Sequence, residues 1–147
     1  MMRRTLATAA LALLTLAAGA CGGDDDSTGP NGSIAGTYTL QTVNGSPPPI
    51  TVFELGDDKI EVTGASVVIN ENGTFSATST VRETDAGQVT TSSSVCSGTY
   101  TRSGSTVTFT EPDSNNEDCG GSYTGTWSNG NTLTIAFGPG LQAVFRK

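Results

Sequence analysis

The sequence contains no histidine and has few charged or aromatic residues. Of its 147 residues, 14 % are charged and 6 % are aromatic. The absence of His excludes an imidazole-based catalytic triad, a zinc–histidine site and a histidine pH switch. The net charge of −7 leaves few cations for phosphates, so we expect no nucleic-acid partner. With 19 Gly and 35 % hydrophobic residues, the chain is typical of one small domain and not of a helical bundle.

Residues 1–20 have the pattern of a signal peptide. Arg3 and Arg4 precede an uncharged apolar run over residues 6–18, and small residues then lead directly to Cys21. A run this short, with small residues at its end, is cleaved after export rather than left spanning the bilayer. We therefore predict that residues 1–20 are removed and contribute nothing to the folded domain.

The residues before Cys21 resemble the lipobox of bacterial lipoproteins, since residues 16–21 read LAAGAC. The resemblance implies lipidation of the Cys21 thiol, cleavage before this residue and acylation of the new amino group. The alternative is an ordinary secretory peptide cleaved near Ala20, which leaves Cys21 as a free thiol. Several acyl chains hold a protein stably on a membrane, whereas one alone does not. The lipobox thus predicts a membrane partner, reached through the acyl chains on Cys21.

Residues 21–33 have the composition of a flexible tether. Residues 22–32 contain no hydrophobic side chain, so this segment cannot bury enough surface to fold alone. We expect it to join the anchor to a folded domain at residues 34–147. Gly22 after the Cys resembles lipoproteins passed to the outer membrane, and the acidic residues 24–26 resemble surface-export tethers or simply solvate a linker. The predicted location is the cell envelope, lipid-anchored in the outer membrane and facing the periplasm or the surface.

From residue 34 onward, polar and apolar residues alternate between frequent turns. Runs such as residues 106–110 and 132–137 carry one apolar face, and Gly-containing turns recur about every ten residues. No stretch shows the apolar stripe of an amphipathic helix. We predict an all-β domain in which an antiparallel meander of eight or nine strands closes into a small barrel, with a β-sandwich as the alternative.

A family resemblance supports the barrel. Gly36-Thr37-Tyr38 on the first predicted strand, together with Arg146 on the last, resembles the Gly-x-Trp signature of lipocalins, with Tyr in place of Trp. In that family the first-strand aromatic residue packs under an Arg from the final strand and closes the barrel floor. The chain is similar to the small bacterial lipocalin-like lipoproteins. This resemblance implies a barrel that binds an apolar or amphipathic small molecule.

The candidate ligand-binding residues are aromatic residues expected to face the barrel interior: Tyr38, Phe75, Phe109, Tyr123, Trp127 and Phe137. Each could instead fill the core, because small eight-stranded barrels are often packed by their own side chains. Three hypotheses therefore stay open. The first is a domain that binds a hydrophobic small molecule, and the second is a structural or interaction lipoprotein with a filled core that acts through its loops or sheet edges. The third is an inhibitor of an envelope enzyme that acts through a loop such as residues 111–120.

Three glycines in different parts of the chain each precede an aromatic residue by two positions. These glycines are Gly36, Gly98 and Gly125. The spacing between the three is irregular, so we do not infer a repeat protein. We interpret each glycine as a point where a strand bends beneath a neighbouring aromatic side chain.

Cys96 and Cys119 form an even pair once Cys21 is assigned to the anchor. In an oxidising envelope we predict a disulfide between them. If Cys96 opens one strand and Cys119 precedes the strand two along, a direct bridge is too long, because next-nearest strands lie about 9–10 Å apart. The loop at residues 112–120 would then have to fold back across the end of the middle strand. The sequence has no Cys-x-x-Cys, so redox catalysis is not expected.

Acidic residues gather in two segments, residues 54–61 and 111–118. Their oxygens suit Ca²⁺, but neither segment has the Gly and terminal Glu of an EF-hand, so we expect solvated loops and no metal. Without His, a serine nucleophile would need a Lys as its base, and neither Lys59 nor Lys147 lies near a suitable Ser in the sequence. We therefore predict a protein that is not an enzyme and has no cofactor.

Overall fold

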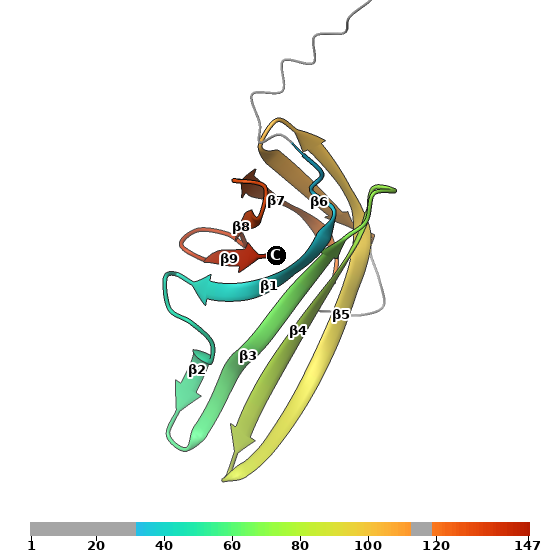
Figure 1. Ribbon diagram of the computed structural model, residues 1–147. Coiled ribbons are helices and arrows are strands. Elements are labelled where there is room, and N and C mark those ends of the chain that lie inside the picture. The colour runs from blue at the N-terminus through green and yellow to red at the C-terminus, as the bar shows by residue number, and fades with distance from the viewer. Residues whose placement is uncertain (1–31, 113–118) are drawn as a thin grey trace, which may run out of the picture.

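The computed structural model describes residues 32–112 and 119–147 (Figure 1). Across these residues the secondary structure consists of nine β-strands without a helix. The strands are β1 Gly36–Val43, β2 Ile50–Leu55, β3 Asp58–Ile69, β4 Thr74–Asp85, β5 Gln88–Ser103, β6 Thr106–Glu111, β7 Gly121–Ser128, β8 Thr132–Ala136 and β9 Gln142–Arg146. The predicted signal peptide, Cys21 and most of the predicted tether lie outside the described residues.

Eight of the strands close into an antiparallel barrel. Their order is β1-β9-β8-β7-β6-β5-β4-β3, and residues 36–39 of β1 pair with β3 to complete the circle. The remaining strand, β2, pairs with β3 alone and lies outside the circle. From β2 to β9 consecutive strands are neighbours, as period-two alternation with short turns favours, whereas β1 pairs with β3 and β9. The prediction of an all-β meander of eight or nine strands that forms a barrel is confirmed, and a sandwich is not formed.

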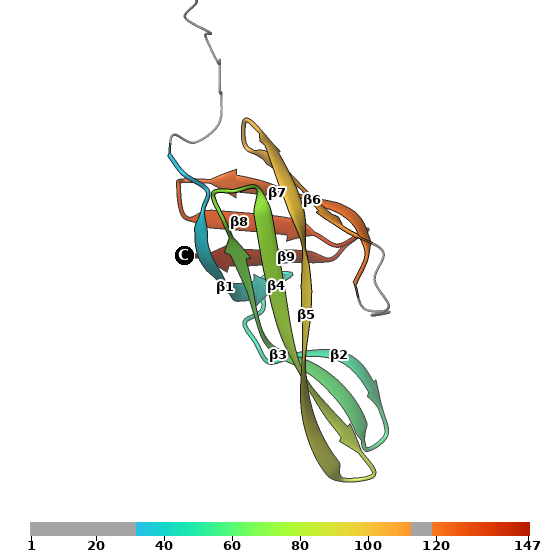
Figure 2. The same cartoon turned by 90° about the vertical axis from the view of Figure 1, so that its right-hand side faces the viewer.

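The barrel has two different ends. In an up-and-down barrel alternate turns lie at the same end, so the turns at residues 70–73, 104–105 and 129–131 share one end with Ser33 and Lys147. We call this the closed end. The opposite, open end carries the turns at residues 86–87 and 137–141, together with β2. Figure 2 shows β3, β4 and β5 running on past the strands β7, β8 and β9 toward this open end.

The hydrophobic core fills the closed end. Phe75 and Phe109 meet edge to face with ring centroids 4.9 Å apart, and Trp127 beside them is fully buried. Burying one such side chain stabilises the fold by roughly 1.5–3 kcal/mol. The largest fully buried side chains are Trp127, Tyr38, Phe75, Phe109, Ile69, Leu133, Ile135 and Val107.

Two cations and the residues before β1 cover this core. The Arg102 guanidinium lies 4.4 Å from the Trp127 ring centroid. Lys147 Nζ lies 5.5 Å from the Tyr38 ring centroid, and the Tyr38 hydroxyl donates a hydrogen bond to the Ile34 carbonyl at 2.7 Å. Cations over aromatic faces are favourable by about 0.5–2 kcal/mol.

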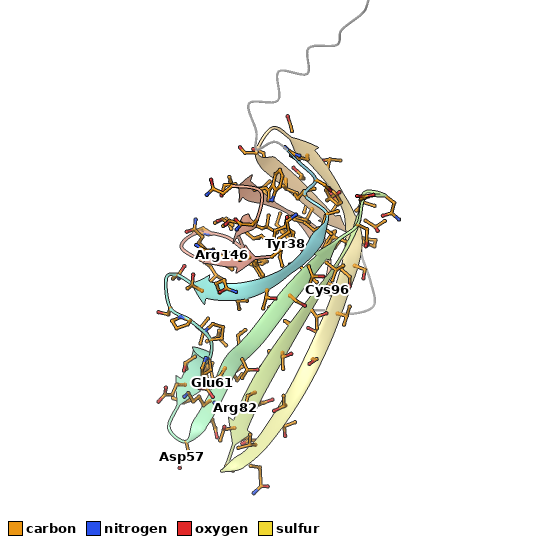
Figure 3. All side chains as sticks on the ribbon, viewed as in Figure 1. Tyr38, Asp57, Glu61, Arg82, Cys96 and Arg146 are labelled. Atoms are coloured by element: carbon orange, nitrogen blue, oxygen red, sulfur yellow. A yellow bond between two sulfur atoms is a disulfide. The ribbon has the colours of Figure 1, made fainter. Side chains whose placement is uncertain are left out.

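The lipocalin resemblance assigns this covering role to Arg146, and the structure gives it to other residues. Arg146 is exposed, because its neighbour Phe145 is the residue of β9 that points into the barrel (Figure 3). Lys147 and Arg102 provide the cations over the aromatic floor instead. Tyr38 is buried at the closed end, but the cation over its ring is Lys147 and not the adjacent Arg146.

Gly98 and Gly125 each allow a close approach between strands. A Cβ atom at Gly98 would collide with the Thr110 carbonyl oxygen and lie 3.0 Å from the Phe75 ring. At Gly125 it would lie 2.9 Å from the Thr134 carbonyl oxygen. At both positions the nearest atom is therefore backbone of the neighbouring strand, and at Gly98 an aromatic ring, that of Phe75, lies against the glycine as well.

A candidate ligand-binding groove at the open end

On β3 and β4 the inward-facing side chains become smaller over three successive cross-strand sets that lead away from the closed end. The cross-strand set Ile69–Phe75–Gly98 is followed by Val67–Ala77–Cys96 and then by Ala65–Ser79–Ser94. Each step moves two residues along the strands, so all three sets point to the same face of the sheet. Because a barrel wall has a fixed circumference, small residues in the last set leave space that no side chain fills.

The strands also separate at the open end. Beyond residue 39, β1 pairs only with β9, while β3 pairs with β2 and β4. A fork therefore opens between β1 and β3, and a groove of about 730 Å³ lies in it. This volume falls in the range of small-molecule sites. The open-end groove is lined by Leu40, Val43, Asn44, Ser46, Ile50, Thr51, Val52, Val62, Ala65, Ser79, Phe137, Leu141, Ala143 and Phe145.

The turn between β8 and β9 forms one rim of the open-end groove. Phe137 and Leu141 on this turn are 48 % and 43 % exposed, which is unusual for large apolar side chains. Asn44, which follows the neighbouring strand β1, fixes the turn. Its amide nitrogen donates to the Gly140 carbonyl at 2.9 Å, and its amide oxygen accepts from the Gln142 N–H at 2.9 Å. The apolar rim is thus held in place by a polar clamp.

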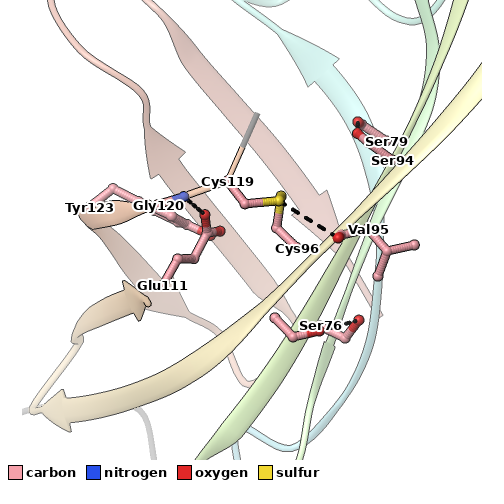
Figure 4. Close-up of a disulfide and its surroundings, with 10 residues drawn as sticks. Ser76, Ser79, Ser94, Val95, Cys96, Glu111, Cys119, Gly120 and Tyr123 are labelled. Carbon is pink, nitrogen blue, oxygen red and sulfur yellow. Dashed lines mark hydrogen bonds between the residues drawn. A yellow bond between two sulfur atoms is a disulfide. The ribbon is translucent and has the colours of Figure 1, made fainter. Parts of the chain in front are cut away.

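A smaller hollow of about 270 Å³ adjoins the open-end groove, and both are lined by Ala65, Ser79, Phe137 and Phe145. We call it the disulfide pocket, because Cys96 lies in its wall (Figure 4). Glu111 and Tyr123 line its far side. The buried Glu111 carboxylate accepts one hydrogen bond from the Tyr123 hydroxyl and one from the Gly120 N–H, each 2.9 Å long. Burial raises the pKa of Tyr123 well above its usual range, and the bonded Glu111 carboxylate raises it further.

The predicted disulfide between Cys96 and Cys119 is confirmed, with their Cα atoms 5.5 Å apart. The expected obstacle is absent, because Cys96 lies inside β5 rather than at its start. The last β5–β6 pair is Thr99 with Thr110, so β6 has ended before the level of Cys96. Cys119 therefore reaches β5 directly, and no loop has to cross a middle strand. The sequence analysis placed Cys96 at the start of a strand, whereas β5 begins earlier, at Gln88.

The two acidic segments do not form a metal centre in the described residues. Cys96, Glu111 and Cys119 lie within 4.8 Å of one another, but the sulfurs are joined in the disulfide and offer no thiolate ligand. In the other segment Glu61 is buried, with Lys59 Nζ at 2.7 Å and Arg82 Nη2 at 2.6 Å. These bonds hold the pKa of Glu61 below its usual range, and the bond to Lys59 has the largest effect. Residues 113–118, which carry most of the other acidic cluster, lie outside the described residues.

The structure divides the six aromatic candidates into two groups. Tyr38, Phe75, Phe109 and Trp127 belong to the closed-end core and line neither hollow. The structure thus places these four residues in the core and away from both hollows. Tyr123 lines the disulfide pocket and Phe137 lines both hollows. The interior is thus filled at one end and open at the other.

Several groove residues were missed because they are small or lie on the outer hairpin. Ala65, Ser79 and Phe145 line both hollows, and Val52 belongs to β2 outside the barrel. The decreasing series Phe75, Ala77, Ser79 along one face of β4 is the signal that could have found them. Selecting aromatic residues as the ligand contacts instead favoured the positions that fill a core.

Comparison with known proteins adds no relative. No family model matches the chain, and no curated protein is significantly similar to it in sequence. In the part of the chain that is described, no helix is long and apolar enough to cross a membrane. The function is therefore argued from the open-end groove and the sequence features described above.

Proposed function

We propose that this protein is a non-catalytic, lipid-anchored lipoprotein of the bacterial envelope whose barrel domain binds an apolar small molecule in the open-end groove. The observation that carries the binding role is the fork between β1 and β3, whose walls are mainly apolar and whose rim exposes Phe137 and Leu141. Large exposed apolar side chains around a concave surface are typical of ligand sites. The lipocalin resemblance is in keeping with this role.

The position of the groove suits an anchored domain. Ser33 and Ile34, which follow the predicted tether, lie at the closed end, and the groove lies at the opposite end. A domain held at Cys21 would then present its groove away from the anchoring membrane. The missing His and the scarcity of Lys support a binding role over catalysis.

Binding is tested with an uncharged fluorescent dye, N-phenylnaphthylamine. We expect its emission to rise when it enters the groove of the wild-type protein. The Ala65→Phe variant fills the space shared by both hollows and should lose this signal. The matched Ala136→Phe variant adds the same ring at an exposed position of β8 and should keep it. Trp127 is not the reporter of choice, because it is buried in the closed end.

No dye binding by a folded wild-type protein would contradict the binding role. It would favour the alternative of a structural or interaction lipoprotein that acts through loops or sheet edges. Equal loss in both variants would mean that the dye binds elsewhere. Circular dichroism of each variant shows whether the barrel is intact.

The anchor is tested separately by replacing Cys21. We expect Cys21→Ala to move the protein from the membrane fraction to the soluble fraction and to abolish labelling with a fatty-acid analogue. Thr28→Ala in the predicted tether should leave both properties unchanged. Unchanged membrane retention of Cys21→Ala would refute the lipoprotein assignment without affecting the binding proposal.

A further inference from the structure

The cations at the closed end of the barrel cannot serve the open-end groove. The chain has seven Lys and Arg residues, of which Arg3 and Arg4 belong to the predicted signal peptide. Arg102 lies over Trp127 and donates to the Gly104 carbonyl at 2.7 Å. Lys147 donates to the carbonyl of Ser33 at 3.0 Å. Both side chains therefore make their contacts at the closed end, opposite the groove.

The remaining three cations lie on the outer surface. Lys59 and Arg82 both bond to Glu61, which faces away from the barrel interior because its neighbour Val62 lines the groove. Arg146 is exposed next to the inward-pointing Phe145 and faces the opposite side of β9. Neither hollow is lined by a Lys or Arg among the described residues. Residues 113–118 contain none in sequence.

Acidic side chains are also scarce in the lining of the two hollows. The open-end groove has no Asp or Glu in its described lining, and the disulfide pocket has Glu111 alone. Both oxygens of that carboxylate already accept hydrogen bonds, from Tyr123 and Gly120. The neutral polar groups at the groove, which include the hydroxyls of Ser46 and Thr51, can bond a ligand hydroxyl or carbonyl.

We infer that the ligand of the open-end groove is an uncharged apolar molecule, such as a long-chain alcohol or ester, and that the groove discriminates against the carboxylate of the same chain length. This inference rests on the proposed binding function. A carboxylate that enters the groove loses water and finds no cation, and it also approaches a chain with a net charge of −7. A neutral head group has neither this desolvation penalty nor this repulsion.

The test compares three ligands with one chain: decanol, methyl decanoate and decanoate. Each is titrated against the protein with bound N-phenylnaphthylamine. At about pH 8, where the acid is ionised, decanol and the ester should displace the dye at concentrations at least about tenfold lower than decanoate. At about pH 4 much of the acid becomes neutral, and the difference from decanol should shrink.

A charge-insertion variant makes the test independent of ligand solubility. Leu141→Lys places a cation on the exposed rim of the groove, and Leu141→Gln removes the same apolar contact without adding charge. We expect Leu141→Lys to bind decanoate several-fold more tightly than Leu141→Gln does, with equal binding of decanol by the two variants.

The outcomes separate this inference from the proposed function. If decanoate displaces the dye from the wild-type protein as well as decanol does at about pH 8, the groove does not select against charge and the inference is wrong, while the binding function stands. If the dye and all three ligands fail to bind, the proposed function is wrong and the inference falls with it. Tighter binding of the neutral ligands supports both.

Discussion

The two ends of the barrel are built from the same strands but differ in what their side chains do. On β4, Phe75 packs edge to face against Phe109 at the closed end, while Ser79 on the same face borders both hollows at the open end. Period-two alternation points both residues inward. Side-chain size along the strand, and not the direction of the side chain, therefore decides whether an inward position belongs to the core or to a ligand site.

The ends also differ in what holds them together. The closed end is held by packed aromatic rings and by cations over those rings. Its turns also bond to the strands: the backbone N–H of Trp127 donates to the Ser105 carbonyl at 2.8 Å. The open end relies on the Cys96–Cys119 disulfide and the Asn44 clamp. We expect the closed-end core and the disulfide both to contribute to stability, and ligand binding to depend on the open end alone, so paired substitutions should separate the two properties.

The largest difference in stability is expected between two variants, one that truncates an aromatic residue at the closed end and one that does so at the open end. Trp127→Ala should lower the free energy of unfolding by about 3–5 kcal/mol, because it empties a fully buried site. Phe137→Ala removes a ring that is 48 % exposed and should cost below about 1 kcal/mol, yet it should weaken dye binding. Urea denaturation and the dye titration measure the two effects. Similar costs for the two variants would erase the distinction between the ends.

Loss of the disulfide should have the next largest effect. The bridge closes a loop with a sequence separation of 23, so the Cys96→Ala, Cys119→Ala double variant should lose about 3 kcal/mol of stability. Reducing the wild-type protein should give the same loss, while the double variant should not respond to reductant. A difference well below 1 kcal/mol between oxidised and reduced wild-type protein would show that contacts other than the bridge hold the open end.

Two glycine substitutions compare close packing with open space. Gly98→Ala should cost about 1–3 kcal/mol, because its Cβ meets the Thr110 backbone and the Phe75 ring. Gly64→Ala on β3 has no atom within 4 Å of the added Cβ and should be neutral or stabilising by up to about 1 kcal/mol. Thermal melts of both variants provide the measurement. If Gly98→Ala melts like the wild type, β5 and β6 do not approach as closely as described.

The smallest effect is a pH dependence at the outer face. The pKa of Glu61 is lowered in the folded state by its bonds to Lys59 and Arg82. The stabilisation of the fold by ionised Glu61 is therefore complete above the unfolded-state pKa of about 4.3. It is lost as the pH falls through the lower pKa of the folded state. Glu61→Gln should be less stable than wild type near neutral pH, with the gap closing in acid.

The exposed Glu83 provides the control for this titration, because it lies on the same pair of strands. Glu83→Gln should show no comparable pH-dependent gap. Dye binding should be unchanged in both variants, since neither residue lines a hollow. A stability gap for Glu61→Gln that persists in strong acid would mean that the side chain acts through packing rather than charge.

Most of the fold could be predicted from the sequence because it follows from local rules. Alternation defined the strands, glycine-containing turns set their order, and the even pair Cys96 and Cys119 gave the disulfide. The polar segment at residues 88–94 was missed, because a strand without an apolar face gives no alternation signal. It forms part of β5 since β4 pairs with it over its full length.

The candidate site was harder to predict because it depends on where strands part. The groove exists because β1 leaves β3 after Thr39, and that register is a property of the closed barrel rather than of either segment. Aromatic residues such as Trp127 and Phe109 looked like ligand contacts for the same reason that they make good core residues. The decreasing side-chain size along β4 points toward Ser79, but the pairing of the strands is needed to show that Ala65 and Ser79 border the open space.

The bonds from Lys147 to the carbonyls of Ser33 and Ala35 have a consequence for protein engineering. They place the start of β1 beside the last residue of the chain, so a short linker could join the two and new termini could be opened at Ala86 and Gly87 without changing the order of strands in the barrel. The turns at the groove are internal hairpins, which can be lengthened or exchanged like the loops of an antibody scaffold. The proposed attachment point and the proposed binding groove thus lie at opposite ends of the barrel, so each could be redesigned without changing the other.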